Sequence, residues 1–159
     1  MAGVAEQVTA AKEIIPIASD HAGFPLKQEI ARALGELGYQ VQDLGTRSEA
    51  STDYPDFAHP LAKEVSEGEV KRGVLLCGTG LGMSYVANRY PHVRAAVAWT
   101  PEIAELARKH NDANILVLPA RFVTTEQGKA ILKTWLETPF EGGRHERRVE
   151  KIEREPGEG

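Results

Sequence analysis

Residues 73–84 carry the residue types best suited to chemistry. A short apolar run ends in Cys77, the one cysteine of the chain, and Gly78, Gly80 and Gly82 follow at alternate positions. Glycine lets a backbone turn tightly and lets N–H groups approach a ligand closely. The segment therefore sets a thiol beside a potential anion-binding loop, which suits chemistry on a small, negatively charged molecule. Taken alone, Cys77 is equally compatible with a buried small hydrophobe.

The glycine spacing matches neither common nucleotide-binding motif. The dinucleotide fingerprint needs G-x-x-G after its first glycine pair, and Met83 stands after Gly82. A P-loop needs Gly-Lys-Ser/Thr, which is missing here. The chain also has no G-x-S-x-G turn of a Ser-His-Asp hydrolase. No paired His or Cys spacing of the kind that zinc prefers is present, so we expect no metal site.

Two other segments bring titratable groups. Asp20 and His21 directly follow the first apolar run, although they could form no more than an Asx-type turn with a surface histidine. His110 and Asn111 stand at the end of a predicted helix, where a histidine is often only a favourable partner of the helix dipole.

Arginines form the last candidate group. Arg144 and Arg148 are four residues apart and should share one face of a final helix, and Arg121 follows the last apolar run. Guanidinium groups suit phosphate oxygens. The alternative is a solvated, charged helix. We expect His145 and Arg147 to face solvent.

Composition limits the class of protein. Hydrophobic residues make up 42% and charged residues 26% of 159 residues, values ordinary for one soluble domain with one core. The net charge of −4 does not indicate binding to nucleic acid or to an acidic membrane surface. No apolar run approaches the ~20 residues of a membrane span. The N-terminus lacks a signal-peptide pattern, and a single cysteine favours a reducing compartment, so we expect a cytoplasmic protein.

Five apolar runs alternate with helical patterns. The runs predict strands at residues 14–19, 39–44, 73–76, 93–98 and 115–118. This alternation predicts an α/β fold with a parallel sheet and helices on both faces. Such sheets bind ligands at the C-terminal ends of their strands, near the point where the strand order reverses. Asp20 and Cys77 should therefore share one crevice. We expect one domain at residues 13–152, between a flexible leader (1–12) and a flexible tail (153–159).

Five ordered motifs resemble those of the type B ribose-5-phosphate isomerases, a family that also contains galactose-6-phosphate isomerase subunits. In chain order they are Ser19-Asp20-His21-Ala22-Gly23-Phe24, Thr52-Asp53-Tyr54-Pro55, Cys77-Gly78-Thr79-Gly80-Leu81-Gly82-Met83-Ser84, His110-Asn111-Asp112-Ala113-Asn114 and Glu141-Gly142-Gly143-Arg144-His145 with Arg148. The resemblance implies a Rossmann-like, doubly wound sheet of five parallel strands. It also implies no metal or organic cofactor, and a homodimer or a dimer of dimers with active sites across the dimer interface.

The resemblance further implies interconversion of ribose 5-phosphate and ribulose 5-phosphate through a cis-enediolate. By motif position, Cys77 matches the catalytic base, and His110 matches the residue that donates a proton in opening the sugar ring. Thr79 is suited to donate or relay a proton at the substrate oxygens. The other positions that match substrate contacts are Asp20, His21, Tyr54, Gly78, Gly80, Leu81, Gly82, Ser84, Asn111, Arg121, Arg144 and Arg148.

Two other functions are compatible with these residues. The same chemistry could act on a tetrose 4-phosphate or on allose or galactose 6-phosphate, and the length of the pocket between Cys77 and the arginines would decide. A non-catalytic sugar-phosphate or nucleotide sensor on the same fold belongs to a different class. A sensor, however, has no need of Cys77 and His110 together.

Overall fold

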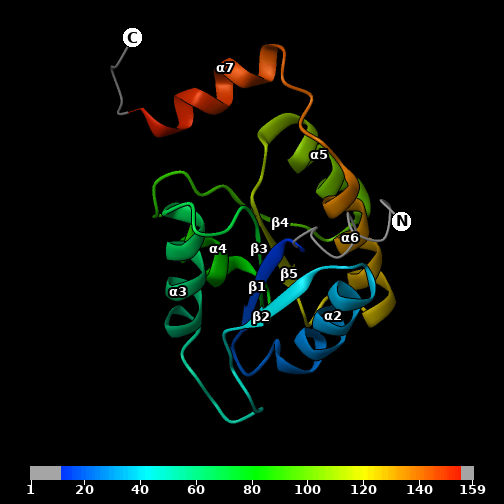
Figure 1. The fold of residues 1–159 in the computed structure, drawn as a ribbon. Helices are drawn as coiled ribbons and strands as arrows, with labels where there is room; N and C mark the ends of the chain where they lie inside the picture. The colour runs from blue at the N-terminus through cyan, green and yellow to red at the C-terminus, as the bar shows by residue number, and fades with distance from the viewer. Residues whose placement is uncertain (1–11, 155–159) are drawn as a thin grey trace, which may run out of the picture.

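A computed structural model describes residues 12–154, so the leader at 1–11 and the tail at 155–159 lie outside the described residues. Within 12–154, five parallel strands form one sheet in the order β2-β1-β3-β5-β4 (Figure 1). The strands are β1 (Ile14–Ser19), β2 (Gln40–Asp43), β3 (Gly73–Cys77), β4 (Ala95–Val97) and β5 (Ile115–Pro119). The predicted fold class is confirmed.

Helices cover both faces of the sheet. They are α2 (Phe24–Glu36), α3 (Pro55–Ser66), α4 (Leu81–Ala87), α5 (Pro101–Asn111), α6 (Thr125–Glu137) and α7 (Arg144–Glu150), followed by the 3₁₀ turn η1 (Lys151–Glu153). One core joins the sheet to α2, α5 and α6 and contains the fully buried Trp135, while a second core joins it to α3 and α4 and contains Met83. Among residues 12–154, none of these helices combines the length and apolar character that crossing a membrane requires.

Local sequence signals set several helix boundaries. The Thr100 hydroxyl accepts a hydrogen bond from the Ile103 N–H at 3.2 Å, and Pro101 opens α5, as an N-cap with proline at the first position predicts. The last helix begins at Arg144, directly after two glycines. Gly142 and Gly143 have φ angles of +70° and +56°, which a right-handed helix cannot contain. Together they redirect the chain before α7.

An ion pair between a buried lysine and a partly exposed aspartate ties α2 to the end of β2. Lys27 is 1% exposed, and its Nζ lies 2.7 Å from both carboxylate oxygens of Asp43. The Asp43 carboxylate also accepts a hydrogen bond from the Gly45 N–H at 2.9 Å. The Gly45 carbonyl in turn accepts from the Ser19 N–H at 2.8 Å, so the pair anchors the turn that lies beside the end of β1. Burial alone raises the pKa of Asp43, but the hydrogen bonds from Lys27 and Gly45 and the charge of Lys27 outweigh it and lower that pKa.

Asp43→Asn is expected to destabilise the fold by about 1–3 kcal/mol near neutral pH, because the buried ammonium of Lys27 loses its charged partner while solvent around the 38% exposed Asp43 screens the pair. Lys27→Met should lower the free energy of unfolding by less, since it leaves behind a carboxylate that still contacts water. The depressed pKa of Asp43 means that its contribution is present above about pH 4 and is lost as the pH falls through the folded pKa. Denaturant unfolding at neutral and acid pH measures this. A gap between wild type and Asp43→Asn that does not narrow in acid would contradict the electrostatic explanation.

Candidate active site

The C-terminal ends of β1 and β3 lie side by side where the strand order of the sheet reverses. β1 pairs with β2 on one side and with β3 on the other. Just beyond the ladder, the Asp20 N–H donates to the Leu76 carbonyl at 3.3 Å. The chain leaves β1 for α2 and leaves β3 for α4, on opposite faces of the sheet, and a crevice opens between the two connections.

This crevice has a volume of about 300 Å³ and holds many of the candidate side chains. Asp20 and Cys77 lie in it together, as the strand pattern predicts. Its lining consists of Asp20, His21, Ala22, Tyr54, Cys77, Gly78, Thr79, Gly82 and Arg121. Three further candidates belong to the same segment but do not line the crevice: Gly80, Leu81 and Ser84. The Ser84 hydroxyl donates instead to the Leu81 carbonyl at 2.7 Å.

Cys77 ends β3 with 5% of its surface exposed. Its carbonyl accepts from the Ala120 N–H at 2.8 Å, and the Gly78 carbonyl accepts from the Arg121 N–H at 3.0 Å. These two bonds hold the loops after β3 and β5 together. A Cβ on Gly78 would lie 3.2 Å from the Arg121 side chain, so the arginine lies against this glycine. A thiol and a guanidinium group thereby share one wall of the crevice.

The glycines after Cys77 are required by close packing. Gly80 has a φ of +79° and ends the loop immediately before α4, so L side chains are disfavoured there. Gly82 faces the ring of Tyr54, which lies 2.6 Å from where a Cβ would be. The first turn of α4 follows this loop directly, with the Leu81 N–H donating to the Thr79 hydroxyl at 3.2 Å, and N–H groups of a first helical turn have no partner within the helix. Such N–H groups stabilise negative charge on a thiolate or an oxyanion.

The tautomer of His21 follows from its hydrogen bonds. The Thr52 backbone N–H lies 3.1 Å from His21 Nδ1 and can only donate, so Nδ1 is the acceptor. The backbone N–H of His21 in turn donates to the Thr52 hydroxyl at 3.1 Å. Nε2 therefore carries the proton of the neutral ring and is the donor left for a ligand. Asp20 does form the Asx-type turn, accepting from the Gly23 N–H at 3.0 Å, and lines the crevice as well.

A second hollow, of about 370 Å³, contains the other candidates. His110, Asn111 and Arg148 line it, with His145, Val149 and Ile152. α5 begins beyond the C-terminal end of β4 and runs back along the sheet. Its last residues therefore lie near the N-terminal ends of the strands, next to α7 (Figure 1). Eleven residues at 1.5 Å each make this return about 16 Å long. Within one chain, the structure therefore does not bring His110, Asn111, Arg144 or Arg148 to Cys77.

The expectation that His145 faces solvent is wrong. His145 is buried and stacks on His110, with ring centroids 4.3 Å apart and planes at 15°. Burial, followed by the charges of Arg144 and His110, lowers the pKa of His145, and only Glu141 opposes the shift. The redirection at Gly142 and Gly143 turns this ring inward. The sequence does contain an indication that His145 could face Glu141, because the two residues are four apart in one motif.

Known proteins resemble this chain over most of its length. A sequence profile of the Ribose/Galactose Isomerase family matches residues 15–152. Ribose-5-phosphate isomerase B of Escherichia coli (strain K12) is 47% identical over 138 residues, which cover 87% of this chain and 93% of that protein.

Solved structures agree with this match. A ribose 5-phosphate isomerase from Thermotoga maritima has a TM-score of 0.87 at 52% identity, covering 90% of this chain and 99% of that chain. Ribose-5-phosphate isomerase B from Mycoplasma genitalium, solved with bound ribulose-5-phosphate, has a TM-score of 0.86 at 42% identity, covering 91% and 96%. The chain that carries the five motifs therefore belongs to the ribose/galactose isomerase family.

Proposed function

We propose that the protein interconverts ribose 5-phosphate and ribulose 5-phosphate. The observation that carries this proposal is the thiol of Cys77 in a crevice of about 300 Å³, beside a glycine loop and an imidazole that presents an Nε2–H. The names of its relatives support the same substrate pair. Turnover of a panel of tetrose, pentose and hexose phosphates tests the proposal, which requires the pentose pair to have the highest kcat/KM.

The reaction moves one proton between neighbouring carbons. Starting from the aldose, the Cys77 thiolate takes the proton from C2, and the electron pair of that bond forms the double bond of a cis-enediolate. Cys77 then returns the proton to C1 from the same face, while Thr79 relays a proton between O2 and O1. N–H groups of the glycine loop and of the first turn of α4 stabilise the negative charge on the oxygens.

Ring opening and phosphate binding need further groups. Ribose 5-phosphate must open its ring before C2 can be deprotonated, and an imidazole such as that of His110 is suited to donate this proton. His21 and Arg121 offer donors to a phosphate from one side of the crevice. Arg144 and Arg148 are exposed on α7 and provide two more cations for the same group.

We infer that two chains complete each site in a homodimer. His110 lies near the N-terminal ends of the strands and Cys77 at a C-terminal end, so both can act on one substrate only if they come from different chains. Exposed apolar side chains provide a surface for such pairing. They lie on α4, just before and within α5, and after α7: Leu81, Tyr85, Trp99, Ile103, Leu106 and Ile152.

Cys77→Ser is expected to lower kcat by at least ~10²-fold, because a serine hydroxyl is not deprotonated near neutral pH. Substrate affinity and the unfolding midpoint should stay close to those of the wild type, since the two side chains have similar size. Steady-state kinetics and thermal unfolding measure both. Retention of more than about a tenth of the activity would exclude Cys77 as the base.

The shared site predicts that two inactive variants restore activity when mixed. A heterodimer of Cys77→Ser and His110→Gln chains contains one site with both substitutions and one with neither. Random pairing makes about half of the dimers mixed, so coexpression should yield about a quarter of the wild-type activity per chain. Each variant alone should be inactive, which serves as the control. A mixture as inactive as its components would show that each site belongs to a single chain.

Arg148→Ala should raise KM for the sugar phosphate by roughly 10–150-fold, because a hydrogen bond to a charged group contributes ~1.5–3 kcal/mol. It should also lower kcat, since the held phosphate positions the reacting carbons. Arg147→Ala is the matched control, because Arg147 is an exposed neighbour on α7 that does not line the hollow. Similar losses for both variants, or equal losses on free ribose, would show that Arg148 does not bind the phosphate.

A further inference from the structure

One cluster in the described part of the chain has side chains that could hold a metal ion together. It consists of His110, Glu141 and His145, whose candidate ligand atoms all lie within 4.8 Å of one another. His110 comes from the end of α5, Glu141 precedes α7, and His145 lies in the first turn of α7. The cluster lies at the second hollow, at the opposite edge of the sheet from Cys77.

The spacing of the cluster is close to that of a metal site. His110 Nε2 and His145 Nε2 lie 3.7 and 4.0 Å from the same oxygen of Glu141. Bonds of about 2.0–2.2 Å in a tetrahedral zinc site place neighbouring ligand atoms about 3.3–3.5 Å apart. The ligand atoms lie up to 4.8 Å apart and the two imidazoles are stacked at 15°, so the exposed side chains of His110 and Glu141 must turn, and His110 must leave the stack, by more than an ångström to bind one ion with His145.

His145 carries the observation that points to a ligand. Its side chain is 9% exposed, and its Nε2 is buried with no hydrogen-bond partner. A buried polar atom without a partner is unusual in a native protein and often marks the place of an ion or a water. Nε2 faces the Glu141 oxygen at 4.0 Å, too far for a hydrogen bond but near enough for an ion to bridge the two.

The donor set selects the class of ion. Two imidazoles and one carboxylate form the ligand set of zinc sites that leave a fourth position open. Imidazole suits zinc, cobalt and copper, whereas magnesium and calcium prefer oxygen ligands. Arg148 lines the same hollow and its charge opposes a cation, while the carboxylate of Glu141 offsets that charge.

We propose that His110, Glu141 and His145 of one chain form a binding site for a zinc-class divalent ion, separate from the Cys77 crevice of that same chain. The ion binds the lone pair of His110 Nε2, so that this nitrogen can no longer donate a proton to the substrate. Zinc is therefore an inhibitor of the enzyme. The inhibition rests on the proposed role of His110 in catalysis, whereas the binding of the ion does not.

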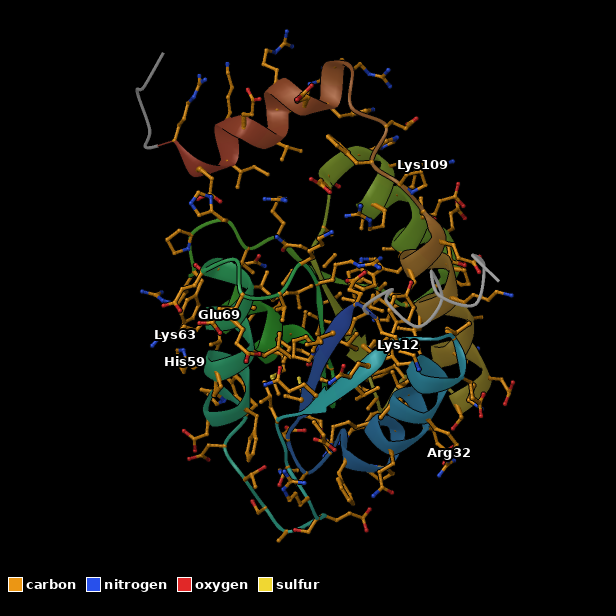
Figure 2. The ribbon with its side chains drawn as sticks, in the orientation of Figure 1. Lys12, Arg32, His59, Lys63, Glu69 and Lys109 are labelled. Atoms are coloured by element: carbon orange, nitrogen blue, oxygen red, sulfur yellow. The ribbon has the colours of Figure 1, made fainter. Side chains whose placement is uncertain are left out.

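Titration of the tag-free, full-length protein with Zn²⁺ by calorimetry, and with Co²⁺ by visible absorption, tests the site. We expect one ion per chain and the d–d absorption of a tetrahedral cobalt centre. His145→Gln and Glu141→Gln should each raise the Kd by at least ~10-fold, the lower limit of what loss of an outer-shell partner costs. His59→Gln is the matched control and should bind as the wild type does, since His59 projects from the outer face of α3 (Figure 2).

Several results would overturn the site. The first is the absence of saturable binding. The second is binding that survives Glu141→Gln, a substitution at an exposed position that leaves the core intact. The third is binding that Cys77→Ser abolishes. The last, with a thiolate-to-cobalt charge-transfer band, would show that the ion depends on a thiolate ligand and that the three side chains do not form the site by themselves. Zn²⁺ should also inhibit turnover until a chelator is added, and full activity with the ion bound would refute the blocking of His110. Ion binding in a protein that converts no sugar phosphate would refute the proposed isomerase function and leave the metal site standing.

Discussion

The parallel pairing of β1 with β3 is the constraint on which the crevice depends. Its register places Ser19 beside Leu76, so the next residues, Asp20 and Cys77, lie together at the C-terminal ends of the two strands. Because the chain then turns to opposite faces, no main-chain segment fills the space between them. Every other feature of the crevice is fitted to this opening: the anchored turn at Gly45, the glycine loop, and the Tyr54 ring against Gly82.

The same topology separates the second group of candidates from the first. In a parallel sheet with connecting helices, residues that end a strand lie at the C-terminal ends of the strands. Residues that end a helix lie at the N-terminal ends. Cys77 ends β3 and His110 lies near the end of α5, so their separation is a property of the fold and not of any side chain. A reaction that needs both groups is then tied to association of chains, for which the apolar surface along α4 and α5 is available.

Much of this structure could be predicted from the sequence because local patterns specify it. Apolar runs located the five strands, and Thr100 with Pro101 located the start of α5. What could not be predicted depends on contacts between distant residues. Lys27 reads as a polar residue of an amphipathic helix, and its burial follows only from Asp43, a partner sixteen residues away. The burial of His145 could not be predicted, because helical periodicity says nothing of the φ angles at the two preceding glycines.

The sparse packing of α7 has a consequence for how stability is distributed. His145 is the only buried residue of this helix, and α7 packs against the end of α5, away from the sheet (Figure 1). Regions with few buried apolar contacts open locally at a small fraction of the global free energy of unfolding. The amide hydrogens of α7 should therefore exchange with solvent while those of β3 and β5 stay protected. The arginines of α7 thus lie on a helix that can unfold locally while the sheet stays folded.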